Sequence, residues 1–480
     1  MISALPPLTL ARMHSKPRVI GRRVFLAHLC LAAVAVTGHA APAPAVHVGV
    51  AKIDITPELP IRLSGYGNRA VEATRGETKL FARALAIGSD AQQPVVLITV
   101  ELIGIGEPTT EAVAAALREK HGLPRERLAI SATHTHTGPA LADVIPFMFS
   151  KELPSEEQGR IDRYTAGLRG KLIAVASAAL ADRKPARIAW GQGSAGFAAQ
   201  RRKIVDGKVT FGVEPAGPHD HALPVMKITD ERGTVRAVFA NYACHCTTLA
   251  GGDNFVHSEW AGDAALRLEA AHAGAVVLFG IGCGADSNPN PRGVPSVPVH
   301  GATVANEIQR VLAGAMRPLG AVTNASFRRI TLDLDHAVTR EDLQKRLEGN
   351  PRVTVSYPAT KWLEQLDAGK PLPTTVPYPV QAWSFGSELT MVFLGGEVVS
   401  EYSLRLRREL DPARVWVNAY SNHVPCYIPS KRMFPEGGYE VDGAMDYYGW
   451  PTRLAIGTED RIIKTVHELV PAAFKQKTQQ

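Results

Sequence analysis

Two histidines separated by a single residue, His134 and His136, are the part of this chain whose residue types most directly suggest chemistry. They follow the apolar run Leu128–Ala132 and precede Gly138 and Pro139, which end a strand. Alternate residues of a strand point to one side, so both imidazoles can approach a single point. Neutral imidazole is the commonest nitrogen ligand for transition metals. The pair therefore indicates a metal site, although a structural or surface role also fits a lone His-x-His.

Two further candidate ligands, His245 and Glu397, each follow an apolar run of their own. His245 comes directly after Val238–Cys244, and Glu397 follows Met391–Leu394 and a pair of glycines. Polar loops that follow the strands of an open α/β sheet gather at one edge of that sheet. Because the two residues share this placement with the histidine pair, we expect all of them to form one site.

The elements that must position these residues alternate between strands and helices. The apolar pattern predicts strands at Val46–Ile55, Phe81–Ile87, Val95–Ile105, Leu128–Ala132, Val235–Cys244 and Ala275–Ile281, and strand-rich stretches at Val322–Leu334 and Val380–Leu394. Helical periodicity predicts helices at Thr109–Lys120, Ser155–Ala181, Ala261–Ala273, Val304–Met316, Arg340–Glu348 and Glu397–Arg408. The segment Asn350–Pro379, with its several prolines, is typical of a loop or an inserted surface segment. The predicted fold class is α/β, with mixed β-sheets flanked by helices.

The first 40 residues have the composition of an export signal rather than of a folded domain. Arg22 and Arg23 precede the apolar run Leu29–Val36, and the small residues of 37–41 follow it. A basic start, a short apolar run and a small-residue exit are typical of a secretory signal peptide. The paired arginines indicate a twin-arginine signal, and an ordinary Sec signal fits nearly as well. We therefore expect residues 1–40 to be removed, residues 41–480 to form the mature domain, and the protein to be exported to the periplasm or secreted.

Composition limits the classes of partner. The chain has 480 residues, of which 45% are hydrophobic and 21% charged, as in ordinary globular proteins. Its net charge is +7, but lysine and arginine are spread along the sequence without a long basic block. This distribution indicates a solvated basic surface and no nucleic-acid partner. A mild attraction to anionic membrane surfaces is compatible with the same charge.

At this point the chain resembles a known family, the neutral or alkaline non-lysosomal ceramidases, which are zinc amidohydrolases that cleave the N-acyl bond of ceramide. The segments that carry the resemblance, in the order and at the spacing of the family, are Ser131–Pro139, Asn241–Leu249, Gly282–Asn290, Gly395–Arg408 and Asn418–His423. The resemblance implies the fold of the ceramidase catalytic domain and one zinc ion per chain.

Residue by residue, the resemblance implies that His134, His245 and Glu397 bind the zinc. It implies that His136 lies beside the metal and contacts the substrate or assists proton transfer. Arg201 matches a family arginine that follows an asparagine, and Gln200 stands in place of that asparagine here.

Three departures from the family pattern bear on function. The fourth zinc ligand of the family is a tyrosine, and the matching position here is His423, itself a competent zinc ligand. Gly282 and Cys283 stand where the family has serine and asparagine. The sequence after the match is too short for the immunoglobulin-like C-terminal domain of the family, so we expect the catalytic domain without it. These departures bear on ceramide as the substrate more than on metal-assisted hydrolysis.

The ligand set predicts a zinc-dependent hydrolase in which the metal activates a water molecule for attack on an amide carbonyl. His136 would carry a proton to the leaving amine. Asp286 would orient a histidine or its own loop, and an ordinary loop-capping role fits it equally well. The substrate class comes from the resemblance alone, which implies ceramide or a related N-acyl lipid.

Several alternatives stay open at this stage. His219 and His221 could form a second metal site, although two histidines in a loop are usually solvated. Cys244 and Cys246 flank His245 and could bind a soft metal, although a role as small buried residues explains them more simply. The function itself could be non-catalytic binding of a lipid or glycan on the same fold, or metal-dependent hydrolysis of a different amide or an ester.

Overall fold

The computed structural model describes residues 46–349 and 351–476, and the predicted signal peptide lies outside these residues. The larger of its sheets has nine strands, in the order β11-β10-β9-β5-β1-β2-β3-β4, with β13 paired to β5. These strands are β1 (Val46–Asp54), β2 (Phe81–Ile87), β3 (Val95–Val100), β4 (Leu128–Ala132), β5 (Lys184–Ser194), β9 (Ala222–Thr229), β10 (Val235–Tyr242), β11 (Val276–Ile281) and β13 (Arg317–Leu319). The pairs β3–β4 and β10–β11 are parallel, and the strands between them are antiparallel, so the sheet is mixed.

A second sheet of four strands lies against the first. Its order is β14-β15-β16-β18, and these strands are β14 (Asn324–Asp333), β15 (Thr375–Phe385), β16 (Leu389–Leu394) and β18 (Val415–Asn418). The remaining strands form two-stranded pairs: β6 (Ala198–Gln200) with β12 (Ser287–Pro289), β7 (Arg202–Val205) with β8 (Lys208–Phe211), and β17 (Glu397–Val398) with β19 (Tyr427–Ile428).

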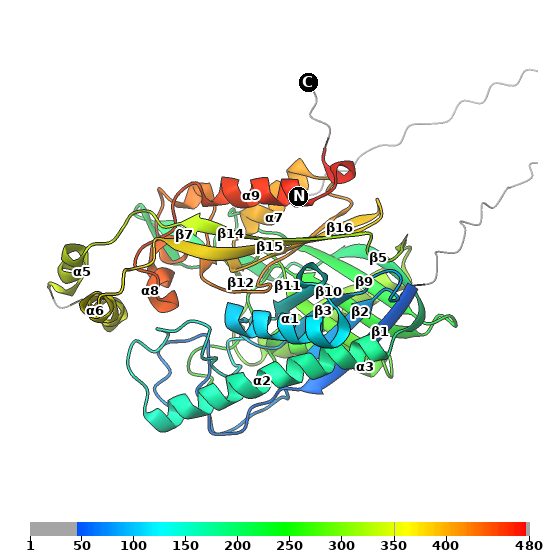
Figure 1. Cartoon of the computed structure of the whole chain (residues 1–480), viewed down its shortest axis with the longest axis horizontal. Coiled ribbons are helices and arrows are strands. Elements are labelled where there is room, and N and C mark those ends of the chain that lie inside the picture. Colours follow the sequence, from blue (N-terminus) through cyan, green and yellow to red (C-terminus); the bar gives the residue numbers. More distant parts are fainter. Residues whose placement is uncertain (1–45, 350, 477–480) are drawn as a thin grey trace, which may run out of the picture. The chain divides into compact units, whose positions relative to one another are not determined.

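Helices cover the outer face of each sheet (Figure 1). The helices are α1 (Glu107–His121), α2 (Ser155–Ala181), α3 (Glu259–Ala271), α4 (Ser296–Ala313), α5 (Arg340–Leu347), α6 (Val353–Asp367), α7 (Ser400–Glu409), α8 (Ala444–Tyr448) and α9 (Thr458–Leu469). Helix α2 contacts β1 to β3, α3 contacts β11, and α4 contacts β5 and β9. On the other side, α7 contacts β18 and α9 contacts β14 and β15. The described part of the chain is therefore built in four layers, helix, sheet, sheet and helix.

The alternation of side chains along each strand explains these layers. In β16, Met391 and Phe393 point into the core between the two sheets, whereas Val392 and Leu394 belong to the core under the helices. Both faces of each sheet are thus apolar, as in strands buried on two sides. Gly49 of β1 lies so close to α2 that an added Cβ would sit 2.0 Å from the Ala179 carbonyl oxygen, which explains a glycine within this strand.

Segments from both ends of the large sheet meet beyond their strands. Edge strand β11 contacts β3 and β4, although these lie at the opposite end of the strand order. An isolated parallel bridge joins Thr135, after β4, to Cys246, after β10. The chain after β18 fills the space between them, since Ala419 donates its N–H to Ile281 O and Asn422 donates its N–H to Ile130 O. This convergence brings the predicted site residues of three separate segments together.

The α/β prediction with mixed sheets and flanking helices is confirmed, and two local expectations need correction. Of the two alternatives for Asn350–Pro379, the loop is wrong, because the described residues of this segment contain α6 and the first part of β15, whose ten pairs with β14 outweigh the local effect of proline. Glu397 does not begin a helix: it lies in the short strand β17, and α7 begins at Ser400.

Among the described residues, the helices are all too short or too polar to cross a lipid bilayer.

Candidate metal centre and substrate cavity

His134 owes its orientation to a sharp local change of backbone rather than to strand alternation. Strand β4 ends at Ala132, and His134 adopts a left-handed backbone with φ of 56°. Such a conformation is strained for a residue with a side chain and is found mainly where a function requires it. Its Nδ1 donates to the Ile103 carbonyl oxygen at 2.5 Å, so its Nε2 keeps a free lone pair. The predicted convergence with His136 is present, but its expected cause, an extended strand, was wrong.

His245 is held in the same manner from another segment. Its Nδ1 donates to the Gly284 carbonyl oxygen at 2.9 Å, and its own carbonyl accepts from Trp260 Nε1 at 2.9 Å. Gly284 allows this contact because a Cβ there would lie 2.4 Å from the Ala243 carbonyl carbon. The Nε2 of His245 therefore points inward with its lone pair available, as required of a metal ligand.

Glu397 completes the group from a third segment. Its Oε2 lies 3.1 Å from His134 Nε2 and 3.1 Å from His245 Nε2. Its Oε1 accepts from the Tyr448 hydroxyl at 2.5 Å. One carboxylate oxygen is thus directed at both histidines, while the tyrosine holds the other in place.

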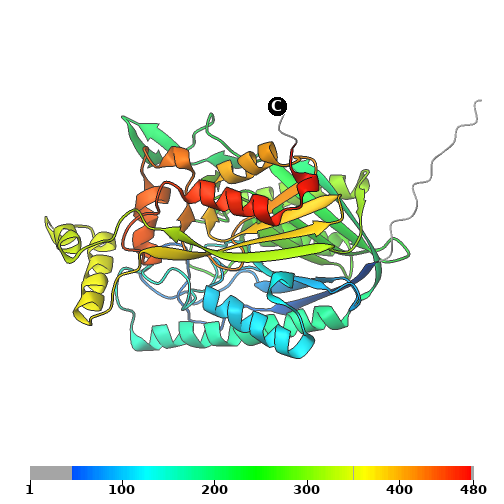
Figure 2. The same cartoon turned by 45° about the horizontal axis from the view of Figure 1, so that its top comes forward.

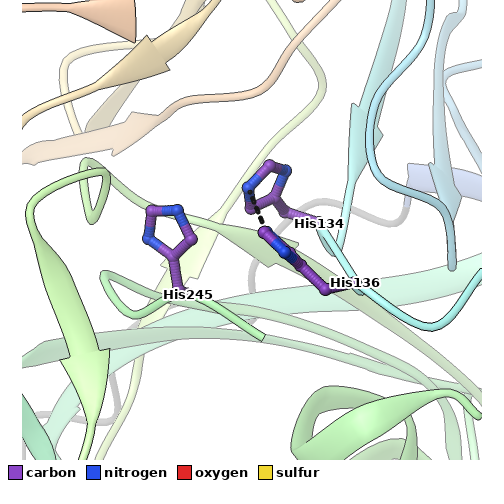
Figure 3. Close-up of side chains that lie close together, drawn as sticks. All are labelled: His134, His136 and His245. Atoms are coloured by element: carbon purple, nitrogen blue, oxygen red, sulfur yellow. Dashed lines mark hydrogen bonds between the residues drawn. The ribbon is translucent and has the colours of Figure 1, made fainter. Parts of the chain in front are cut away.

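These three residues fit a zinc ion in chemistry and spacing. Zinc bonds to nitrogen and oxygen of about 2.0–2.2 Å in a tetrahedron put neighbouring donor atoms roughly 3.3 Å apart. The donor separations of 3.1 Å between Glu397 and each histidine are close to that value. His134, His136 and His245 offer nitrogen atoms that all lie within 4.8 Å of one another (Figure 3).

The charge states also suit a metal. Burial and the neighbouring Arg201 lower the pKa of His245 to about 4, so it is neutral at neutral pH. Burial acts to raise the pKa of Glu397, but His134 and His245 outweigh it and hold the pKa well below its usual value. The neutral imidazole of His245 and the ionised carboxylate of Glu397 are the forms that bind a divalent cation.

His136 lies beside the ligands and lines the cavity described below. Its Nε2 is 3.1 Å from His134 Nε2, and its Nδ1 is buried without a hydrogen-bond partner in the described residues. Burial sets the pKa of His136 well below the usual value, so it is neutral and able to accept a proton. Gly65 packs on this ring, where a Cβ would be 2.5 Å from Nδ1. The backbone of His136 is held by Arg69, which donates to its carbonyl oxygen at 2.6 Å.

Arg201 is brought to the same cavity. One guanidinium nitrogen lies 3.3 Å from His245 Nε2, and another donates to the Tyr427 hydroxyl at 3.1 Å. Its Nε donates to Glu440 at 2.8 Å, a carboxylate that Arg202 also contacts at 2.6 Å. Burial acts to lower the pKa of Arg201, but Tyr427 and Glu440 hold it well above its usual value. Arg201 is therefore a fixed cation at the wall of the site.

Asp286 supports the site without touching its histidines. It is fully buried, and its carboxylate accepts from Gln200 Nε2 at 2.7 Å and from the Ser400 N–H at 2.8 Å. Its carbonyl oxygen accepts from the Arg201 N–H at 2.8 Å. Because Ser400 follows Glu397 by three residues, Asp286 ties the segments of Arg201 and Glu397 together. Burial raises its pKa despite these donors.

The structure does not bring His423 to the fourth-ligand position. Its Nδ1 accepts from the Glu107 N–H at 3.1 Å, so it caps the start of α1 instead. Tyr427 lies beside the ligands, with its hydroxyl 3.3 Å from His245 Nε2. Tyr427 takes this position because it lies in the short parallel pair β17–β19, in which it is the partner of Glu397. Eight residues separate Asn418 from Tyr427 in this chain, so a match based on the spacing of the family motif did not identify this tyrosine.

The other candidate sites do not assemble. The rings of His219 and His221 are 4.1 Å apart, but they belong to no cluster of three potential ligands within the described residues. Cys244 and Cys246 are buried free thiols whose pKa values burial raises well above the usual one. They are small core residues rather than ligands.

A cavity of about 410 Å³ opens onto the candidate metal centre. His136 and Glu397 line its inner end, together with Arg201 and Tyr427. The rest of its lining consists of the glycine-containing loop 65–68, apolar residues and a group of aromatic side chains, namely Ile103, Ile145, Met148, Phe211, Tyr439, Tyr447 and Tyr448, with Thr247, Asn288 and Arg292 at polar positions. Three tyrosines come from one short segment, 439–448, which also supplies Glu440.

Sequence reasoning missed this tyrosine segment and the supporting Arg69. Tyr439, Tyr447 and Tyr448 stand near a Gly437-Gly438 pair, and isolated aromatic residues in such a context usually serve packing. Their role depends on the π-helical turn at Tyr439–Gly443, which directs the segment against Arg201 and Glu397. Nothing in local composition signals that turn.

Comparison with known proteins shows the family of this chain. Residues 46–293, more than half of the 480-residue chain, match the family of neutral/alkaline non-lysosomal ceramidases, N-terminal domain. The chain belongs to this family.

Solved structures show the same fold at low identity. The neutral ceramidase from Pseudomonas aeruginosa superposes with a TM-score of 0.64 at 17% identity, covering 91% of this chain and 76% of the ceramidase chain. A ceramidase complexed with C2 superposes with a TM-score of 0.65 at 17% identity, covering 91% of this chain and 78% of that one.

Proposed function

We propose that this protein is an exported zinc-dependent amidohydrolase that cleaves the N-acyl bond of ceramide or a related N-acyl lipid. The observation that carries the proposal is the convergence of His134, His245 and Glu397 on one point at the inner end of a cavity, with His136 beside them. Membership of the ceramidase family supports the reaction class. The ceramidase complexed with C2 supports a lipid-like substrate.

The three donor residues would hold the metal, and Tyr427 stands next to them as the candidate for a fourth contact. A zinc ion bound there supplies Lewis acidity, which lowers the pKa of water and polarises an amide carbonyl.

The residues of the chain perform the remaining tasks. His136 is neutral and lines the cavity, so its imidazole can take a proton at Nε2 and deliver it to the leaving amine nitrogen. Arg201, a fixed cation whose guanidinium is near His245, can donate hydrogen bonds to an oxygen that gains negative charge. Tyr448 and Asp286 hold Glu397 and its segment in the required position.

A direct test uses the purified mature chain loaded with zinc. It measures release of the carboxylic acid from ceramide, N-acyl amino acids and simple esters in parallel, and release of the amine from the two amide substrates. The proposal expects amine release from an N-acyl lipid, lost on chelation and restored by added zinc. Hydrolysis of esters alone would instead support a metal hydrolase of a different bond. Bound lipid without released product would support the binding-protein alternative.

We further propose that residues 1–40 direct export and that the mature chain contacts membrane surfaces peripherally. The basic and apolar pattern of the leader supports export, and the net charge of +7 supports attraction to anionic lipids. N-terminal sequencing of the protein from the periplasm or medium should give a start near residue 41. Replacement of Arg22 and Arg23 by lysine should block export only if the twin-arginine route is used.

A further inference from the structure

The β7–β8 hairpin carries an unusual share of exposed apolar side chains. Of the large apolar residues that are exposed in the described part of the chain, Ile204, Val205 and Phe211 belong to this hairpin, and Val213 follows it directly. Its strands pair with each other and with no larger sheet, and it projects from the molecule (Figure 2, upper left). A two-stranded hairpin gains little stability from exposed apolar groups, so their presence points to a ligand.

The register of the hairpin places these residues on two different faces. Ile204 pairs with Val209, and Arg202 pairs with Phe211. Directly opposed residues share a face, as do residues two apart in one strand, so Ile204, Val209 and Phe211 form one stripe. Val205 lies on the other face, opposite Lys208.

The stripe begins inside the substrate cavity. Phe211 lines the cavity, and its ring lies 5.3 Å from that of Tyr439, another lining residue. Val209 packs next to Gly438, where a Cβ would be 3.0 Å from the valine Cβ. Ile204 continues the stripe outward and is 55% exposed, while Phe211 is 62% exposed. An apolar path therefore runs from the cavity to the surface along one face of the hairpin.

The cavity is too small to enclose a long-chain N-acyl lipid alone. Pockets of about 300–1,000 Å³ are typical for a single drug-sized ligand, and this one has about 410 Å³. That space suits the reacting amide and the first part of one chain. The remainder of a long chain must leave the cavity, and the stripe is the apolar surface that continues from it.

We propose that the stripe formed by Ile204, Val209 and Phe211 binds the distal part of the substrate's acyl chain and sets the preference for chain length. This inference rests on the proposed function and specifies where the acyl chain of the substrate binds. The occupant is a single extended hydrocarbon chain, because the side chains that this face offers to solvent are apolar. Arg202 shares the face opposite Phe211, but it is buried and paired with Glu436 and Glu440.

The test compares Ile204→Ser and Phe211→Ser with Val205→Ser, which removes a similarly exposed apolar group from the opposite face. N-acyl amines that share one amine and carry butanoyl to hexadecanoyl chains are assayed as monomers, below the concentration at which they aggregate. The ratio of kcat/KM for hexadecanoyl to that for butanoyl should fall about tenfold in each stripe variant, as expected for the loss of one buried apolar contact. Val205→Ser should leave this ratio unchanged.

Three outcomes would overturn the proposal. An unchanged ratio in both stripe variants would remove the stripe from substrate binding. An equal fall in Val205→Ser would show a general effect of the hairpin. A fall seen only with substrate in phosphatidylglycerol-containing vesicles, and not with monomers, would assign the hairpin to a membrane surface.

A second readout separates this inference from the proposed function. Calorimetric titration with straight-chain fatty acids from butanoic to hexadecanoic acid measures chain binding without any reaction. If the wild-type chain cleaves no N-acyl amine, the proposed function fails. Binding that strengthens with chain length, and loses that dependence in Phe211→Leu and Phe211→Ser in increasing order, would still support the stripe, and length-independent binding would reject it.

Discussion

Two segments of this chain carry the same His-x-His pattern, and only one of them becomes a candidate metal centre. The rings of His219 and His221 lie 4.1 Å apart, closer than the 4.7 Å between His134 and His136. Proximity of two imidazoles is therefore no measure of a site.

The difference lies in what comes from elsewhere. A backbone carbonyl engages Nδ1 of His219 at 2.9 Å, just as one engages Nδ1 of His134, so both rings keep Nε2 free. His245 and Glu397 arrive from distant segments to complete the first group. No third potential ligand joins the second pair within the described residues. A site thus depends on convergence of separate strand ends more than on the local motif.

The largest expected effect is on metal content, which should differ between variants of the candidate metal centre and variants of the His219–His221 pair. His134→Ala, His245→Ala and Glu397→Ala should each lose bound zinc, because each removes one of three protein donors, and turnover should fall by more than about a hundredfold. His219→Ala and His221→Ala are matched controls and should keep full metal content. Elemental analysis of the purified variants gives the answer, and normal zinc in the first three would refute the ligand assignment.

His136 is expected to transfer a proton and not to bind zinc, so its variant separates these two roles. His136→Ala should keep zinc and lose roughly 10²–10⁴-fold in kcat, as expected when a general acid–base group is removed. Its metal content and its kinetics should be measured on the same preparation. Loss of zinc along with activity would make His136 a ligand instead.

Tyr427 and His423 are the two candidates for the fourth zinc ligand, and their variants distinguish between them. Tyr427→Phe should weaken zinc affinity by about 10–100-fold, since its hydroxyl contacts His245 and is bridged to Arg201. His423→Ala should leave zinc affinity unchanged and lower the free energy of unfolding by about 1 kcal/mol, because it removes the acceptor at the start of α1. Competition with a chelator measures the first quantity and chemical denaturation the second. The reverse pattern would restore His423 as a ligand.

The last effect is on stability alone and concerns the support of the third histidine. Glu259 is fully buried beside Trp260, which holds the His245 carbonyl, and burial raises the pKa of Glu259 from 4.5 to about 7. Between pH 4.5 and about 7, the Glu259 carboxyl is therefore protonated in the folded chain and ionised in the unfolded chain. This contribution to stability is present below pH 4.5 and is lost as pH rises through about 7, by up to about 3 kcal/mol.

Denaturant titrations across pH 4.5–8 test this point. The wild-type free energy of unfolding should decline with pH in that window, and Glu259→Gln should flatten the decline. Glu401→Gln, at a half-buried position of α7, is the control and should leave the slope as in the wild type. An identical slope in Glu259→Gln would show that Glu259 is ionised in the fold.

Much of the framework could be predicted because it follows from local pattern. Composition and periodicity predict the apolar strands β2, β4 and β11 and the long amphipathic helix α2. His134, His245 and Glu397 could be proposed because each follows such a run. The rest depended on long-range pairing: β17 with β19 places Tyr427, and the π-helical turn at Tyr439–Gly443 places Tyr448. Neither contact leaves a signal within a short window of sequence.

The most direct test of the central claim is zinc K-edge X-ray absorption on the zinc-loaded mature chain, with His245→Ala measured alongside. We predict that nitrogen and oxygen atoms coordinate the zinc at about 2.0–2.2 Å, with two imidazoles and no sulfur, and that His245→Ala retains too little zinc to give this spectrum. A sulfur contribution at about 2.3 Å, or an unchanged spectrum in His245→Ala, would contradict it.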